Sequence, residues 1–250
     1  MHLLDFVEAL TDSKTVDTVW RLLSGELEEH GFDRVMYGLT KFRTANSLGD
    51  REDLLVLNNY KNPDYVKEYI EGRLYYDAPM LHWAAENDGA CSWRYVADNM
   101  EKLTPKELRI LEINRQYDLT AGYTISFHEV SIRVRGGMSL GARKGLSQDD
   151  VDRIWEEHGR KLHQMARLAH LKISTLPFPE ETRQLTKRQR EVLELAGDGK
   201  TMQEMSIIIG LSQATVEKHL RLAREALDVE TTAQAVVKAT VRNQIYILYS

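Results

Sequence analysis

Six polar side chains between residues 213 and 224 have a spacing that places most of them on the outer face of one helix. Lysine and arginine bind phosphate oxygens, and arginine and glutamate also form hydrogen bonds with base edges in the major groove of DNA. Glu217 and Arg221 lie one turn apart, so we expect Arg221 to contact a guanine and Glu217 a cytosine amino group. We expect Lys218 and Arg224 to bind phosphate. The predicted DNA-binding residues are Gln213, Thr215, Glu217, Lys218, Arg221 and Arg224.

Three short amphipathic helices are predicted to position this face. Thr186 with Gln189, and Thr201 with Glu204, have the spacing of capping boxes, which begin two helices. Gly210 then precedes a third helix with a continuous apolar stripe, and a short helix, a glycine turn and a second helix form a helix-turn-helix. Any small three-helix domain shows such caps and stripes, so the pattern alone leaves a purely structural role open. The stripe comprises Val216, Leu220, Ala223 and Leu227.

A second group of side chains, between residues 60 and 139, has the composition of a small-molecule site. Buried tyrosine and tryptophan need hydrogen-bond partners for their polar atoms, and an apolar pocket with a few convergent polar groups is the usual form of a ligand site. Asp77 and Ser139 supply further polar groups. A core packed with rings explains the same residues, so both interpretations stay open. The aromatic residues are Tyr60, Tyr65, Tyr69, Tyr75, Tyr76, Trp83, Trp93 and Tyr95.

No group of side chains has the spacing of a catalytic or metal centre. His163 and His170 share a helix face without an acidic partner of obvious geometry, and Cys91 has no companion histidine or aspartate in sequence. We expect Gly136 and Gly137 to form a hairpin turn, because no phosphate-loop pattern accompanies them. The sequence therefore predicts a protein that is not an enzyme and holds no metal or cofactor.

Charge and hydropathy argue against a membrane protein and a secreted protein. The net charge is −5, but from Pro177 onward ten Lys and Arg balance ten Asp and Glu, so the preceding part carries the whole excess. A neutral C-terminal part implies weak DNA binding by a monomer, so we expect a homodimer. No apolar run approaches the roughly 20 residues of a membrane span, and the N-terminus lacks the features of a signal peptide. The single cysteine fits a reducing compartment, so we expect a cytoplasmic protein that does not engage a membrane.

The segment that includes Pro177 and Pro179 divides the chain, since proline cannot continue a helix. We expect an N-terminal domain over residues 1–173, a linker over 174–184 and a helical DNA-binding domain over 185–250. The fold class is α+β, with an N-terminal α-β-α sandwich around a mainly antiparallel sheet and an all-α C-terminal domain. The predicted helices cover 2–10, 15–30, 63–72, 78–87, 104–117 and 147–173, and the predicted strands 34–42, 54–58, 122–130 and 132–142.

The C-terminal segment resembles the DNA-binding domain of the LuxR-type transcription factors. The resemblance rests on LT-x-R-x-x-EVL from Leu185, GKT from Gly199 and TVEKHL from Thr215, with a matching turn around Gly210. Gln189 stands where glutamate is more usual in that family. The resemblance implies a transcriptional regulator that binds a double-stranded DNA operator.

Upstream, the chain resembles the autoinducer-binding domain of quorum-sensing regulators. That resemblance implies that Tyr60 and Ser139 contact an acyl carbonyl, that Asp77 accepts the ligand amide N–H, and that Trp93 lies near a lactone ring. It therefore implies an N-acyl homoserine lactone or a related amphiphile as the ligand.

Two departures from the family pattern lie in this region. Tyr65 takes the place of a tryptophan that donates its indole N–H to the lactone carbonyl, and Asp77-Ala78-Pro79 replaces the usual Asp-Pro. They motivate a second hypothesis, a ligand-independent regulator whose N-terminal domain only dimerises or binds a protein partner. A cavity of a few hundred Å³ between the sheet and the helices near Tyr60 distinguishes the two hypotheses.

Overall fold

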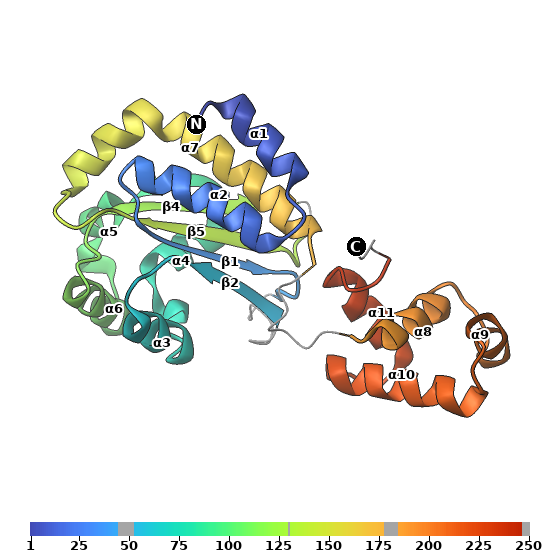
Figure 1. Ribbon diagram of the computed structural model, residues 1–250. Helices are drawn as coiled ribbons and strands as arrows, with labels where there is room; N and C mark the ends of the chain where they lie inside the picture. Colours follow the sequence, from blue (N-terminus) through green and yellow to red (C-terminus); the bar gives the residue numbers. More distant parts are fainter. Residues whose placement is uncertain (45–52, 130, 178–184, 247–250) are drawn as a thin grey trace. The chain divides into compact units, whose positions relative to one another are not determined.

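A five-stranded sheet organises the N-terminal part of the chain (Figure 1). The computed structural model describes residues 1–44, 53–129, 131–177 and 185–246, and the chain divides into two units, Met1–Ser174 and Thr175–Ser250. Residues 178–184 of the predicted linker lie outside the described residues. Every pair of neighbouring strands is antiparallel, in the order β2 (Leu54–Asn58), β1 (Arg34–Thr40), β5 (Arg135–Gly141), β4 (Gly122–His128) and β3 (Gly89–Ser92).

Helices cover both faces of this sheet (Figure 1). One face is covered by α2 (Val16–Glu29) and the long α7 (Gln148–Thr175), with α1 (Leu3–Asp12) packed on α2. The other face is covered by α3 (Pro63–Glu71), α4 (Pro79–Glu86), α5 (Arg94–Asp98) and α6 (Pro105–Gln116). Two 3₁₀ helices, η2 (Leu74–Asp77) and η3 (Met100–Lys102), join the helices of the second group. The predicted α+β class, with its mainly antiparallel sheet, is confirmed. Within the described residues no helix is both long and apolar enough to cross a membrane.

The two faces of the sheet differ because side chains alternate along a strand. On β1, Val35, Tyr37 and Leu39 are fully buried on the face covered by α2 and α7. The residues between them belong to the opposite face, where β1 and β5 pair Gly38 with Gly137. One face is therefore a packed core, and the other has two neighbouring positions without side chains.

The predicted turn at Gly136 and Gly137 is wrong, because both glycines lie inside β5. A Cβ at Gly136 would lie 2.5 Å from Cε1 of His170, whose ring stacks on Phe127 with centroids 4.4 Å apart. Gly136 therefore allows α7 to approach the sheet closely. A glycine within a strand often marks such an approach of another group.

The prediction that His170 lacks an acidic partner is also wrong. Its Nδ1 lies 2.8 Å from the Tyr37 hydroxyl, and its Nε2 lies 3.0 Å from the Glu129 carboxylate. Burial lowers the pKa of His170, and Glu129 opposes that shift. The imidazole is thus a hydrogen-bonded core group between α7 and the sheet. No cluster of potential metal ligands occurs among the described residues.

β3 and α5 were not predicted from the sequence. β3 has four residues, and α5 has five, so neither is long enough to show the periodicity of its class. β3 is added at the edge of the sheet by its pairing with β4, a contact distant in sequence.

The described part of the C-terminal unit contains the helices α8 (Lys187–Gly197), α9 (Met202–Ile209), α10 (Gln213–Leu227) and α11 (Thr232–Val241). Both predicted capping boxes are present, at Thr186 and Thr201. Gly210 ends α9 with a left-handed φ of 68°, and the Ser212 hydroxyl caps α10. The predicted apolar stripe of α10 is buried within the core of the unit.

We predict that Gly136→Ala destabilises the protein, because the new methyl group meets a His170 ring that Tyr37 and Glu129 hold in place. Overpacking of this kind costs about 1–3 kcal/mol of unfolding free energy, measured by urea denaturation. Gly137→Ala is the matched control, because its Cβ has only one neighbour, 3.8 Å away. Equal stability of the two variants would contradict this account of the glycine pair.

Candidate functional site

A cavity of about 550 Å³ lies between the sheet and the helices of the second group. Its volume is within the range of roughly 300–1,000 Å³ that small-molecule sites occupy. The floor comes from β1, β2, β4 and β5, and the walls come mainly from α3, α4 and α6. Most of the lining is apolar and includes Met36, Val56, Ile70, Leu81, Val96, Ile110 and Leu119.

Three stacked tyrosines form one wall of the cavity. The rings of Tyr60 and Tyr65 have centroids 5.0 Å apart, and those of Tyr65 and Tyr69 are 5.4 Å apart, with interplanar angles of 18° and 19°. The Tyr65 hydroxyl donates to Oδ1 of Asn114 on α6 at 3.0 Å. Burial raises the pKa of all three tyrosines, so their hydroxyls are neutral hydrogen-bond donors at ordinary pH.

The structure brings four of the five predicted ligand-binding residues to the cavity. Tyr60, Tyr65, Trp93 and Ser139 line it, and the Ser139 hydroxyl lies near enough to Tyr60 to lower the pKa of that tyrosine against the larger effect of burial. The Trp93 indole N–H donates to the Thr124 hydroxyl at 2.9 Å. Tyr60 and Ser139 thus present two hydroxyl groups at the edge of an apolar space.

Asp77 is the exception among the five. It ends η2, and its carboxylate lies 3.6 Å from the ammonium group of Lys106 with 38% of the side chain exposed. It is not among the residues that line the cavity, whereas its neighbours Tyr76 and Ala78 are. At this 3₁₀ turn, Tyr76 and Ala78 therefore face the cavity, whereas the Asp77 carboxylate contacts Lys106.

Sequence reasoning missed Asn114 and Thr124, which bind the polar atoms of Tyr65 and Trp93. Neither residue carries a local signal, because Asn114 lies on α6 and Thr124 on β4, far along the chain from their partners. The pairing leaves neither of these buried polar atoms unsatisfied.

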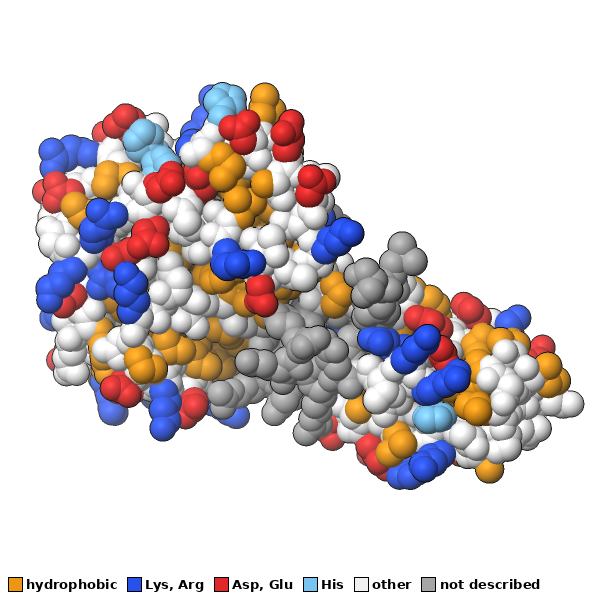
Figure 2. Space-filling view, in the orientation of Figure 1, with side chains coloured by type: hydrophobic (Ala, Val, Ile, Leu, Met, Phe, Trp, Pro, Cys, Tyr) orange, Lys and Arg blue, Asp and Glu red, His pale blue; other side chains and the backbone are white. Residues whose placement is uncertain are grey.

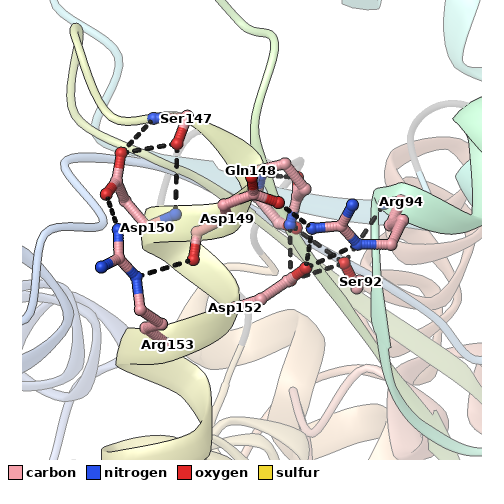
Figure 3. A network of polar contacts seen from close by, with 9 residues as sticks. Ser92, Arg94, Ser147, Gln148, Asp149, Asp150, Asp152 and Arg153 are labelled. Carbon is pink, nitrogen blue, oxygen red and sulfur yellow. Dashed lines mark hydrogen bonds and ion pairs between the residues drawn. The ribbon is translucent and has the colours of Figure 1, made fainter.

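The residues on either side of Trp93 are attached to the first turn of α7 (Figure 3). Ser92 donates to Asp152 Oδ1 at 2.7 Å, and Arg94 Nε donates to Asp152 Oδ2 at 2.9 Å. Burial acts to raise the pKa of Asp152, but these hydrogen bonds, with another from Gln148, lower it on balance. Asp152 is therefore a carboxylate that joins the segment around Trp93 to the long helix.

Gly122 also connects the segment around Trp93 to α7. Its N–H donates to Gln148 Oε1 at 3.0 Å, and its carbonyl accepts from the Trp93 N–H at 3.0 Å. A Cβ at Gly122 would lie 3.0 Å from the Trp93 ring and 2.3 Å from the Leu140 carbonyl oxygen. Only glycine fits between Trp93 and β5.

The second candidate site is the outer face of α10 in the C-terminal unit. Gln213, Glu217, Lys218 and Arg221 are exposed there. Basic side chains and a histidine lie together over this unit on the face drawn in Figure 2, whereas basic and acidic side chains are interspersed over the N-terminal unit.

Four of the predicted DNA-binding residues, Thr215, Glu217, Arg221 and Arg224, form contacts within their own unit. The Thr215 hydroxyl lies 2.8 Å from the Ser212 hydroxyl at the start of α10. Arg224 is only 20% exposed and donates to Glu217 at 3.0 Å and to the Thr232 hydroxyl at 2.9 Å, which joins α10 to α11. Arg221 is 53% exposed and, among the described residues, pairs only with Glu225 on the next turn, so it has the freer guanidinium group.

Comparison with known proteins yields two family matches. Residues 15–173 match the family model described as an autoinducer binding domain, and residues 178–227 match that of sigma-70, region 4. Transcriptional activator protein CarR of Pectobacterium carotovorum subsp. carotovorum is 25% identical over 198 residues, which are 75% of this chain and 79% of CarR.

Two solved structures share the fold. SdiA of Escherichia coli, determined in complex with octanoyl-rac-glycerol, aligns with a TM-score of 0.55 and 15% identity, covering 96% of this chain and 93% of SdiA. CepR2 of Burkholderia cenocepacia, described as an N-acylhomoserine lactone dependent factor, aligns with a TM-score of 0.52 and 16% identity over 68% of this chain and 93% of CepR2.

Proposed function

Because this chain belongs to the LuxR-type family of autoinducer-binding transcriptional regulators, we propose that it binds an N-acyl homoserine lactone or a related amphiphile and, as a homodimer, a two-fold symmetric operator. The family consists of regulators and not of enzymes. The ligand occupies the cavity, and the protein acts in the cytoplasm, where the operator lies.

The observation that carries the ligand-binding proposal is the cavity itself. An apolar space of about 550 Å³ beside the Tyr60 and Ser139 hydroxyls suits a flexible chain that ends in carbonyl groups. Burying the chain gains roughly 25 cal/mol per Å² of apolar surface, and the hydroxyls set its orientation. A domain that binds no ligand would be more stable with this space filled by side chains, because cavities lower the free energy of unfolding.

We assign these roles to the domains predicted from the sequence: 1–173 binds the ligand and dimerises, 174–184 is the linker, and 185–250 binds DNA. The exposed face of α7 supports its part in a dimer, because Glu156, Glu157, Arg160 and Arg167 place both charge signs along it. Two copies of such a face can pair their opposite charges.

The helix-turn-helix contacts the operator through α10. Gln213, Thr215, Glu217, Lys218, Arg221 and Arg224 remain the proposed DNA-binding set, with Arg221 as the base-contacting residue. Because Arg224 is bound to Glu217 and Thr232, its contribution is chiefly to hold α10 against α11. A two-fold symmetric dimer then reads half-sites spaced by about one turn of DNA or a multiple of it.

The hydrogen bonds from Ser92 and Arg94 to Asp152 can transmit the effect of ligand binding to α7. A ligand ring packed on Trp93 contacts the segment whose neighbours, Ser92 and Arg94, are bound to Asp152. Occupation of the cavity thereby favours one placement of the first turn of α7, and it shifts the population of DNA-binding dimers.

We predict that N-decanoyl homoserine lactone raises the melting temperature of the protein, because a ligand that binds only the folded state stabilises it. Ser139→Ala should reduce this rise, since it removes the hydroxyl beside Tyr60. Asp77→Ala is the matched comparison, because Asp77 contacts Lys106 outside the cavity lining. A smaller rise in the Asp77 variant than in the Ser139 variant would contradict this placement, and no rise in the wild-type protein with any of a panel of acyl lactones would rule out the lactone.

We predict that Arg221→Ala weakens binding to a DNA sequence selected by the protein by about 1–3 kcal/mol and relaxes the preference at one base position. Fluorescence anisotropy with single-base variants of the site measures both effects. Lys218→Ala is the control, because loss of a phosphate contact weakens all sequences about equally and reduces the salt dependence. Uniform weakening by Arg221→Ala would assign Arg221 to the DNA backbone instead.

A further inference from the structure

The cavity has a second polar end, formed by two arginines. Arg43 and Arg135 both line it. Arg135 begins β5, and Ser139 follows it on the same strand four residues later, so the two side chains belong to the same face of the sheet about 13 Å apart. The arginines and the Tyr60–Ser139 hydroxyls therefore occupy different ends of one cavity.

Within the described residues, no carboxylate is paired with the charge at the arginine end. Neither Arg43 nor Arg135 forms an ion pair with any residue in the described part of the chain. Burial lowers the pKa of Arg135, the charge of Arg43 lowers it further, and the opposite charge of Asp88 offsets only part of the shift. Two like charges thus lie close together beside an apolar space.

Arg135 also has an unused hydrogen-bond donor. One of its terminal amino groups donates to the Ala85 carbonyl oxygen on α4, which fixes the guanidinium against the cavity wall. Its Nε–H is buried and has no hydrogen-bond partner among the residues that the structure describes. A buried donor without an acceptor is destabilising, so the site favours a ligand that supplies an acceptor there.

The floor between the two ends is bare backbone. Gly38 and Gly137 pair across β1 and β5, midway between Arg135 and Ser139 along the sheet. A Cβ at Gly38 would meet nothing within 4 Å, and one at Gly137 only the Ile125 carbonyl oxygen at 3.8 Å. An extended hydrocarbon chain can lie over these glycines and connect the hydroxyl end to the arginine end.

We propose that Arg43 and Arg135 bind an anionic group on the ligand, so that the natural ligand is an acyl amphiphile with a carboxylate at the far end of its chain. This inference rests on the proposed function of the cavity as an acyl-ligand site. A planar carboxylate matches the fork of a guanidinium, neutralises the arginine pair and accepts from the free Nε–H of Arg135. A terminal methyl group does none of these.

The test compares two lactones of equal length, N-decanoyl homoserine lactone and N-(ω-carboxynonanoyl) homoserine lactone, which differ only in the terminal group. Isothermal titration calorimetry with the full-length protein should show the carboxylated lactone binding at least about tenfold more tightly, as one charge-assisted hydrogen bond implies. Arg43→Gln and Arg135→Gln should each abolish that preference. The readout is the ratio of two affinities for the same variant, so it does not depend on the fraction of folded protein.

Arg133→Gln is the matched control, because Arg133 is exposed, lies two residues before Arg135 and does not line the cavity. It should leave the preference unchanged. Equal binding of the two lactones, with no effect of either arginine variant, overturns the anion site and leaves the proposed lactone function intact.

Decanedioate, which lacks the lactone, distinguishes the remaining outcome. If neither lactone binds but decanedioate binds and requires Arg43 and Arg135, the anion site stands and the lactone assignment fails. If none of the three compounds binds, the anion site is overturned together with the ligand-binding proposal.

Discussion

The N-terminal unit depends on the two-residue alternation of side chains along β1 and β5. The same strands must supply a close-packed core on one face and a hollow on the other. At Gly136 the missing side chain makes room for His170 and draws α7 onto the sheet, while at Gly137, one residue later, it leaves floor space in the cavity. A shift of the β1–β5 register by one residue would exchange these two roles, so core and cavity are determined together.

The cavity persists because polar contacts hold its walls in place without filling it. The stacked rings of Tyr60, Tyr65 and Tyr69 form one wall, and the hydrogen bond from Tyr65 to Asn114 attaches that wall to α6. At the other side, Trp93 is fixed by Thr124 and by the Gly122 carbonyl. Each contact satisfies a buried polar atom of the protein, so the protein does not need a ligand atom to satisfy it. The exceptions, among the described lining residues, include the buried Nε–H of Arg135, where a ligand has most to contribute.

Elements determined by local chemistry could be predicted from the sequence, and those determined by distant contacts could not. The capping boxes at Thr186 and Thr201, and the buried stripe of α10, follow from residues within one or two turns of each other. The role of Gly136 depends on His170 at the far end of α7, and a glycine pair alone therefore indicated a turn. Asp77 was predicted as a ligand contact, but the 3₁₀ turn and Lys106 give its carboxylate another neighbour. The family resemblance identified four cavity residues, whereas Asn114, Thr124 and the arginine pair required the structure.

The central claim is that occupation of the cavity in one unit controls DNA binding by the other, through the junction between Trp93 and α7. The most direct measurement is the dissociation constant for a DNA site selected by the protein, determined by fluorescence anisotropy with and without a saturating lactone whose binding has been shown by calorimetry. The account predicts a change of at least about fivefold, in either direction, as expected for coupling between two sites. Superimposable binding curves with and without bound ligand would contradict it.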